Sequence, residues 1–210
     1  MPAWLLALAA VLGVAHLAGD ATARRALTGF TKPLPVALGL LWAVTLPEPV
    51  SAPYRWLVVV GLACSMVGDV CLLDDARFVP GLASFLLAHL LYLAAFVPTG
   101  GLVWPPLFVI GAVSAVLLGV LWPHLGGMRG PVVAYVTVIG AMAWQAVVRA
   151  LGPATPSPSG ALAAVGAVVF MTSDATLALD RFAHRFRGAH AVVMVTYYAA
   201  QLAIAASVAR

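Results

Sequence analysis

The sequence predicts an all-α membrane protein, a bundle of about eight transmembrane helices. Of its 210 residues, 63% are hydrophobic and only 9% are charged, and its mean hydropathy is +1.05. About a quarter of the residues are charged in soluble globular domains, so the composition excludes that class. Apolar runs separated by Pro, Gly and charged residues follow one another along the whole chain. We therefore expect a single transmembrane domain over residues 1–210.

Eight apolar runs define the expected spans, and most approach the roughly 20 residues that a helix needs to cross a bilayer core. They cover residues 2–19, 33–47, 54–73, 80–97, 103–122, 131–150, 160–179 and 189–208. The first run has no charged leader and no clear cleavage site, so we expect it to be retained as a helix. The second run is short, so we expect it to tilt, to thin the bilayer or to begin as early as Thr28.

Lysine and arginine are distributed unevenly between the two sets of loops. One set holds Arg24, Arg25, Lys32, Arg77, Arg129, Arg181, Arg185 and Arg187, and the other holds Arg55, Arg149 and Arg210. Because cytoplasmic loops carry the excess of Lys and Arg, we expect both termini outside the cytoplasm of a bacterial inner membrane. These residues form no continuous basic patch, so we expect no nucleic-acid partner.

Two aspartates, Asp69 and Asp174, lie inside apolar runs at equivalent places in two related segments. Gly61, Asp69, Leu72, Asp75 and Tyr92 recur 105 residues later as Gly166, Asp174, Leu177, Asp180 and Tyr197. The repeat suggests two four-helix halves in the same orientation, with both carboxylates at similar depth. An ionisable residue in a membrane span is costly and is a functional candidate by default. The alternative is that each aspartate only caps a helix or hydrogen-bonds to a neighbouring one.

Other polar side chains share helix faces with this pair. His89 and Tyr92 lie on one face of span 80–97, and Tyr197 and Gln201 lie on one face of span 189–208. Each is a candidate for binding substrate and is equally consistent with a packed core. Lys32 either reaches the interface with its long side chain or points inward to a lipid phosphate or to Asp69.

Signals of several soluble-enzyme classes are missing. The chain has no GxSxG, HExxH, Walker or dinucleotide glycine motif. No two histidines lie at i and i+4, and Cys64 and Cys71 lie within one apolar run. We therefore expect no metal and no cofactor, and the sequence does not predict an oligomeric state.

Six short motifs, in this order, resemble those of the YhhN family. They are KPLP at 32–35, GLACSMVGD at 61–69, FLLAHLLY at 85–92, PVVAY at 131–135, SDATLALDRF at 173–182 and TYYAAQ at 196–201. Animal members of that family are lysoplasmalogenases, which hydrolyse the vinyl ether bond of lysoplasmalogen to a fatty aldehyde and a glycerophospho-alcohol. The resemblance implies this activity on a lysophospholipid or ether lipid, with Asp69 and Asp174 as the catalytic pair. We add Tyr135 of the PVVAY motif to the substrate-binding candidates.

Two readings of the aspartate pair remain open. Vinyl ether hydrolysis needs a proton on the carbon β to the oxygen and then water on the resulting cation, so one protonated and one ionised carboxyl suit it. The rival is a small-molecule or proton-coupled transporter, or a lipid-binding protein, in which the same pair relays protons or binds a cation. Transporters interrupt matched spans with Gly or Pro, whereas Pro lies only at span ends here, which favours the hydrolase.

Overall fold

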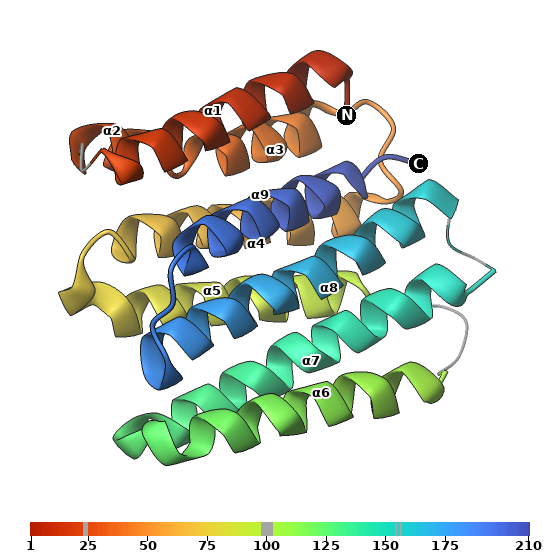
Figure 1. The fold of residues 1–210 in the computed structure, drawn as a ribbon. Helices are drawn as coiled ribbons and strands as arrows, with labels where there is room; N and C mark the ends of the chain where they lie inside the picture. The colour runs from red at the N-terminus through yellow and green to blue at the C-terminus, as the bar shows by residue number, and fades with distance from the viewer. Residues whose placement is uncertain (23–24, 98–102, 154, 156) are drawn as a thin grey trace.

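The computed structural model describes residues 1–22, 25–97, 103–153, 155 and 157–210, where helices are the regular secondary structure (Figure 1). The α-helices are α1 (Ala3–Ala21), α2 (Arg25–Thr31), α3 (Leu34–Thr45), α4 (Ala52–Cys71), α5 (Phe78–Ala95), α6 (Pro105–Leu121), α7 (Arg129–Leu151), α8 (Ser157–Ala178) and α9 (Ala189–Ala206). Short turns are η1 (Asp75–Arg77), η2 (Trp122–His124) and η3 (Gly126–Met128), which are 3-10 helices, and η4 (Leu179–Ala183), which is a π-helix. The predicted all-α membrane bundle is confirmed.

The predicted spans correspond to α1 and to α3 through α9. Within the described residues, the six helices α4 to α9 are long and apolar enough to cross a membrane. α3 has 12 residues, which is about 18 Å at the helical rise and short of a full crossing. The stretch before Pro33 forms the separate helix α2, because proline removes a helical N–H and restricts the residue before it.

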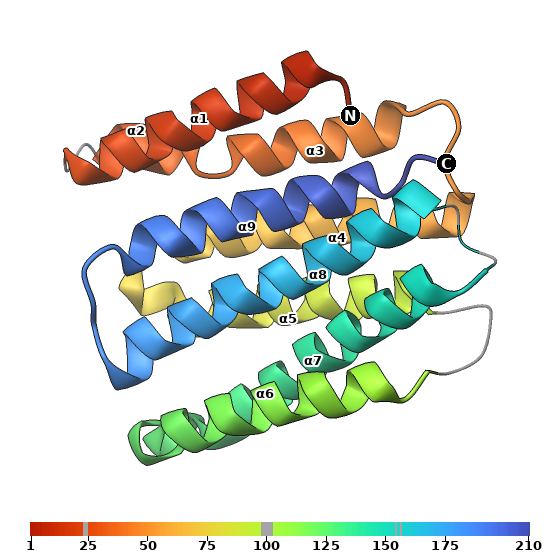
Figure 2. The same cartoon turned by 45° about the vertical axis from the view of Figure 1, so that its right-hand side comes forward.

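Six of the described helices form a ring in which each packs against its neighbours, in the order α3, α4, α5, α7, α8 and α9. α9 packs back onto α3 and also touches α4 across the ring. α1 packs outside the ring against α3 and α9, and α6 packs outside it against α7. Figure 2 shows α1 and α6 at opposite edges of the molecule. The ring therefore includes α4 and α8, the helices that carry Asp69 and Asp174.

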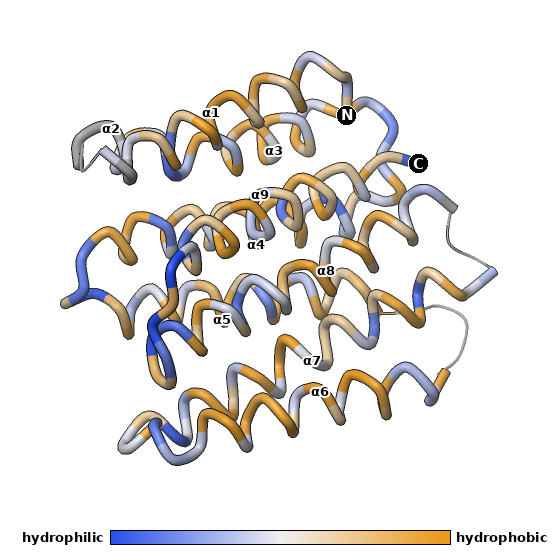
Figure 3. Tube along the Cα trace, in the orientation of Figure 1, coloured by the Kyte–Doolittle hydropathy of each residue, from blue (hydrophilic) through white to orange (hydrophobic). Residues whose placement is uncertain are grey.

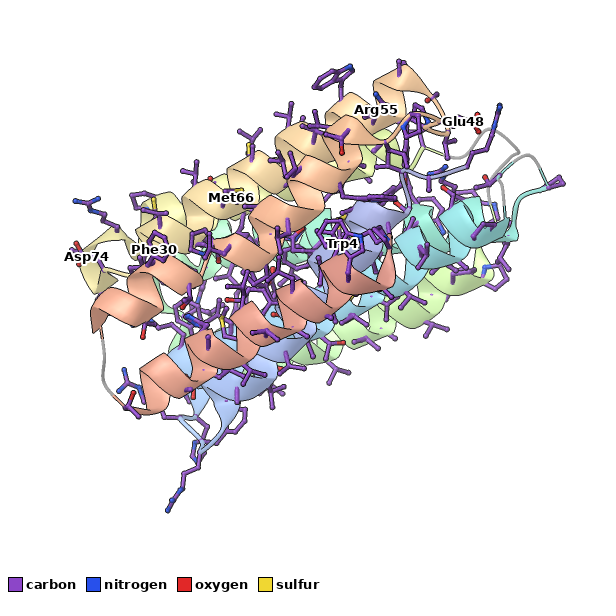
Figure 4. The ribbon with its side chains drawn as sticks, turned by 90° about the horizontal axis from the view of Figure 1, so that it is seen from above. Trp4, Phe30, Glu48, Arg55, Met66 and Asp74 are labelled. Carbon is purple, nitrogen blue, oxygen red and sulfur yellow. The ribbon has the colours of Figure 1, made fainter. Side chains whose placement is uncertain are left out.

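Both chain termini lie at one end of the bundle, and α4 and α8 both run away from that end (Figure 1). Hydrophilic residues collect at the helix ends, most densely where α4 and α8 finish (Figure 3). Figure 4 shows Glu48 and Arg55 at the end opposite Asp74, as expected from the uneven loop charges. Arg24, which belongs to the basic set, lies outside the described residues. The parallel course of α4 and α8 brings their two aspartates to the same end.

Helix boundaries follow from capping residues, proline and glycine. Ser51 precedes α4, and its hydroxyl accepts a hydrogen bond from the Tyr54 N–H at 3.3 Å. Pro53 and Pro105 lie in the first turns of α4 and α6. The N–H group that proline lacks would have no hydrogen-bond partner within the helix at these positions. Gly188 precedes α9 with a φ of +87°, a conformation that L side chains rarely adopt. These residues explain why the expected spans begin within a few positions of the observed helices.

Two glycines allow helices in the ring to pack closely. A Cβ atom on Gly68 of α4 would lie 2.6 Å from the Phe85 ring of α5. A Cβ atom on Gly166 of α8 would lie 2.7 Å from the Ile204 side chain and 3.0 Å from the Ala200 carbonyl oxygen of α9. Close approach of backbones at small residues is the usual basis of helix packing in membranes. The helix pairs that carry the aspartates are therefore held at short range.

We predict that Gly166→Ala destabilises the protein, by about 1–3 kcal/mol, because the new methyl group meets a backbone carbonyl that a rotamer change cannot move. The matched control is Gly111→Ala on α6, where nothing lies within 4 Å of the added atom. There the change should be neutral or slightly stabilising, since alanine is the better helix former. Thermal unfolding of both variants in detergent measures the difference, and equal midpoints would contradict the packing argument.

Candidate active site

Asp69 lies on α4, two residues before the helix ends at Cys71, and only 2% of it is exposed. The Tyr197 hydroxyl of α9 donates a hydrogen bond to Asp69 Oδ2 at 2.7 Å. Lys32, in the turn between α2 and α3, is buried and interacts electrostatically with the same carboxyl group. A carboxyl group at this position needs such partners because lipid offers none. Three parts of the chain therefore meet at Asp69.

Asp174 lies on α8, four residues before the helix ends at Ala178. The Tyr135 hydroxyl of α7 donates a hydrogen bond to Asp174 Oδ2 at 2.6 Å. His89 Nε2 of α5 lies 3.7 Å from the same oxygen, which is longer than a hydrogen bond. The His89 ring packs edge-on against Tyr135 and Phe170, with ring centroids 5.2 Å and 4.6 Å away. Each aspartate is thus held by one tyrosine hydroxyl from another helix.

Asp69 and Asp174 line the same cavity, which has a volume of about 200 Å³. We call it the polar cavity. Its ionisable and hydroxyl-bearing residues are Lys32, Asp69, Asp75, Ser173, Asp174, Asp180, Arg181, Arg185, His190 and Tyr197. Several of them are exposed at the end of the bundle where α4 and α8 finish, so the cavity has a mouth on the water side of that end. The two carboxyl groups can therefore face one substrate.

The mouth of the polar cavity is bridged by an ion pair between two loops. Arg181 Nη1 of η4 lies 2.8 Å from Asp75 Oδ1 of η1, and the Arg181 guanidinium stacks 4.6 Å from the centroid of the Phe78 ring. An exposed pair of this kind contributes only about 0–1 kcal/mol to stability. The η4 π-helix is itself an unusual element that occurs often at functional sites. The bridge thus sets the position of η4 over the cavity more than it stabilises the fold.

Asp174 also lines a second, smaller space of about 50 Å³ between α5, α6, α7 and α8. We call it the apolar chamber, because Tyr135 and Asp174 supply its polar groups and the remaining residues are hydrophobic. Those are Phe78, Leu82, Leu117, Val132, Val136, Ile139, Met171, Ala175, Leu177, Ala178 and Phe182. Asp174 therefore stands at the boundary between a polar and an apolar space, whereas Asp69 lines only the polar one.

Three of the candidate residues lie behind the cavity walls. Tyr92 of α5 donates a hydrogen bond to Gln201 Oε1 of α9 at 2.8 Å, and both side chains are fully buried. His89 is also fully buried and lines neither space. Of the residues expected to bind substrate, the structure brings Lys32 and Tyr197 to the polar cavity and Tyr135 to the apolar chamber. Tyr92 and Gln201 instead link two helices of the ring.

The 105-residue offset accounts for the two aspartates but not for their partners. It pairs Tyr92 with Tyr197, so a strict repeat would have Tyr92 bind Asp174 as Tyr197 binds Asp69. Tyr135 of α7 takes that place instead. The rim arginines and the apolar chamber were also not expected as site components. The sequence could have identified Arg181 as a site residue, because it follows an aspartate at the end of a span. It could not have identified Leu117 of the apolar chamber, because that residue lies on a helix that is apolar on nearly all sides.

The arrangement suits proton transfer by carboxyl groups. Two aspartates, each positioned by a tyrosine hydroxyl, line one water-accessible cavity and have basic side chains near its mouth. Within the described part of the chain, no group of three or more His, Cys, Asp or Glu side chains could hold a metal ion. General acid and base catalysis by paired carboxyl groups is the chemistry that these residues can provide.

We predict that the polar cavity is reached from water, and that a cysteine replacing Leu177, which lines it, reacts with a water-soluble maleimide. The matched control is Ala167→Cys on the same helix, because Ala167 is fully buried in the ring. Both changes belong in a background without Cys64 and Cys71, which are free thiols. Labelling is followed by mass shift. Equal labelling of the two positions, or none at Leu177→Cys, would contradict an open cavity.

Comparison with known proteins agrees with the resemblance of the motifs. Residues 27–208 match the YhhN family. Lysoplasmalogenase TMEM86B from Homo sapiens is 39% identical over 175 residues, which cover 82% of this chain and 70% of that protein. Lysoplasmalogenase TMEM86B from Mus musculus is 38% identical over 184 residues, 85% of this chain and 73% of that protein. An uncharacterized membrane protein YhhN from Escherichia coli is 29% identical over 177 residues, 82% of this chain and 84% of that protein. No solved structure matches the chain.

Proposed function

Because the chain belongs to the YhhN family, we propose that it is a membrane-embedded lysoplasmalogenase. It hydrolyses the vinyl ether bond of lysoplasmalogen, and the products are a fatty aldehyde and a glycerophospho-alcohol. Relatives that bear the name lysoplasmalogenase support the reaction class. The carboxyl pair supports the chemistry, since the reaction needs one proton donor and one proton acceptor.

The single observation that carries the proposal is the position of Asp174 between the polar cavity and the apolar chamber. A lysoplasmalogen has a charged head group and one hydrocarbon chain, and the vinyl ether joins the two. With the head group in the polar cavity and the chain towards the chamber, the vinyl ether lies beside Asp174. Asp69 then faces the same bond from the other wall of the polar cavity.

Asp174 is assigned as the general acid because it borders the apolar side, where the chain and its β-carbon lie. In the first step its carboxyl proton moves to the β-carbon, the double bond supplies the electron pair, and an oxocarbenium ion forms. The carboxylate left on Asp174 then lies next to that cation and stabilises it. Tyr135 holds the reacting oxygen of Asp174 in place through its hydroxyl group.

Asp69 is assigned as the general base because it lines only the polar cavity, where water is available. It takes a proton from a water molecule as the water oxygen bonds to the carbon next to the ether oxygen, which gives a hemiacetal. As the hemiacetal breaks its bond to the glycerol oxygen, that oxygen takes the proton from Asp69 and the hemiacetal hydroxyl gives its proton to Asp174. This step leaves the aldehyde and the free alcohol and returns both carboxyl groups to their starting states. Tyr197 holds the Asp69 carboxylate for this step. Two carboxyl groups divide the same tasks in glycosidases.

Lys32 and Arg185 are assigned to the lipid head group. Both line the polar cavity, Arg185 is exposed at its mouth, and within the described residues Arg185 makes no ion pair with a carboxylate. A guanidinium can bind a phosphate through two parallel hydrogen bonds, and an ammonium can act as a second positive charge. His89, Tyr92 and Gln201 act from behind the walls, by supporting the helices that carry the aspartates.

A transporter remains the rival function for an aspartate pair at matched depth. Transporters of that kind build their sites from interrupted helices. In this protein α4 and α8 carry the aspartates on uninterrupted stretches, Ala52–Cys71 and Ser157–Ala178. The uninterrupted helices thus favour a hydrolase with a fixed site over a transporter. A test for aldehyde release distinguishes the two functions directly.

We predict that the purified protein releases aldehyde from lysoplasmalogen, and that Asp69→Asn and Asp174→Asn each lower the rate by about 10² to 10⁴-fold. The double variant should be little worse than either single one, because residues that share one mechanism are strongly non-additive. The wild-type rate should fall at both low and high pH, since the pair must hold one proton. A coupled aldehyde assay across pH measures all four proteins.

The matched control for this experiment is Asp74→Asn. Asp74 is an exposed residue at the same end of the bundle, it lines neither space, and asparagine can replace it as the cap of η1. This variant should keep wild-type activity. Size-exclusion profiles establish that the inactive variants remain folded. No aldehyde from the wild type would favour the transporter, and an active double variant would remove the aspartates from the mechanism.

The protein is an integral multi-pass membrane protein, and we propose a bacterial inner membrane with both termini outside the cytoplasm. The support is the charge of the two ends of the bundle. Six basic residues lie in or beside the connections α2–α3, α4–α5, α6–α7 and α8–α9, namely Lys32, Arg77, Arg129, Arg181, Arg185 and Arg187. These connections are at the end opposite the termini (Figure 1). The positive-inside rule assigns that end to the cytoplasm. In this orientation the polar cavity draws its substrate from the cytoplasmic leaflet.

We predict that alkaline phosphatase fused after Arg210 is active in bacterial cells, because this enzyme folds only outside the cytoplasm. Green fluorescent protein fused at the same point should be dark for the same reason. The same reporters fused to a chain truncated at Arg129 serve as the internal control. There the phosphatase should be inactive and the fluorescent protein bright. An inactive phosphatase together with a bright fluorescent fusion at Arg210 would overturn the orientation.

A further inference from the structure

The apolar chamber is too small to hold the hydrocarbon chain of a lysolipid. Its volume is about 50 Å³, whereas pockets that enclose a drug-sized ligand measure about 300–1,000 Å³. A long chain that starts beside Asp174 must therefore leave the chamber. The remaining question is where it goes.

A much larger apolar groove lies on the outside of the bundle, between α6 and α8. Its volume is about 690 Å³, and it extends along α6 from Pro106 to Val120. That stretch is about 21 Å long at the helical rise. One leaflet of the bilayer core is about 15 Å thick, half of the whole core. The groove is therefore long enough to take one hydrocarbon chain of one leaflet.

The groove and the apolar chamber share part of their walls. Leu117 of α6 and Met171 and Ala175 of α8 line both spaces. Ala175 directly follows Asp174, so the shared wall lies next to the carboxyl group that we assign as the acid. Methionine is unbranched and adapts its shape easily, and alanine is small, so this wall presents little steric resistance. No charged residue separates the groove from the site.

We infer that the lipid substrate reaches the site sideways from the bilayer, between α6 and α8, and that its hydrocarbon chain occupies the α6–α8 groove during the reaction. This inference rests on the proposed function. The occupant is a single hydrocarbon chain, because the groove shares part of its wall with the apolar chamber that borders Asp174, where that chain must begin. α6 lies outside the ring and packs on α7 (Figure 2). The side chains of Val109, Val113 and Val116, which line the groove, are exposed, so the groove is open to lipid.

Filling the groove tests the route. Val168→Phe on α8, at a position that lines the groove but not the apolar chamber, should lower kcat/KM for a long-chain lysoplasmalogen at least tenfold, and it should leave a short-chain, water-soluble vinyl ether within about threefold of wild type. The matched control is Ala115→Phe, which places the same side chain at an exposed position of α6 that does not line the groove. This control should cleave both substrates at wild-type rates.

A second variant guards against an indirect effect on Asp174. Val116→Trp fills the groove from α6, away from both carboxyl groups, and should also lower kcat/KM for the long chain alone. A lysolipid with a photoreactive diazirine near the end of its chain adds a binding measurement that needs no turnover. It should label peptides of α6 and α8, and Val116→Trp should reduce that labelling.

The outcomes separate the route from the reaction. A wild type that cleaves neither substrate overturns the proposed function and the route with it. A wild type that cleaves both overturns the route alone if Val116→Trp keeps full activity on the long chain, or if the diazirine labels other helices. Equal losses on both substrates in Val168→Phe and Val116→Trp also overturn it, since filling the groove would then disturb the fold and not the binding of the hydrocarbon chain. If the wild type shows a concentration-dependent oligomeric mass in detergent and Val116→Trp abolishes it, the occupant of the groove is a second copy of the protein, and the route is overturned.

Discussion

The structure depends on the need to satisfy two carboxyl groups inside an apolar bundle. Lipid cannot hydrogen-bond to them, so their partners must come from the protein or from water in the polar cavity. Tyr197 joins α9 to α4 at Asp69, and Tyr135 joins α7 to α8 at Asp174. The first bond joins helices that are 128 residues apart in the sequence, and the second joins two consecutive helices. The ring of helices can thus be understood as the arrangement that brings both hydroxyl groups to their carboxylates.

Close helix packing is the second condition for this arrangement. Gly68 leaves no room for a methyl group where α4 packs on α5, and Gly166 leaves none where α8 packs on α9, so both helices that carry an aspartate lie close to a neighbour. The buried link between Tyr92 and Gln201 adds a third connection across the ring. Polar bonds and small residues therefore act together, since neither would position the carboxyl groups without the other.

The sequence predicted the parts of this structure that depend on local composition. Apolar runs located the spans, proline and glycine located their ends, and the isolation of Asp69 and Asp174 in apolar surroundings identified them as the candidate pair. The partner of Asp174 could not be predicted in this way. Tyr92 and Tyr135 are both tyrosines in apolar spans, and only the rotation of each helix in the bundle decides which one reaches the carboxylate. The apolar chamber was also hidden, because a helix with no polar face, such as α6, gives no periodic signal.

In the proposed reaction, the place of Asp174 between two kinds of space has a consequence for the fate of the products. The aldehyde retains the hydrocarbon chain and dissolves in the bilayer, while the glycerophospho-alcohol has no chain and dissolves in water. Each product is formed on the side of the carboxyl group that faces its own solvent. Release of one product therefore does not depend on release of the other. Because the products separate into different phases, both are dilute at the site, and the reverse reaction is slow.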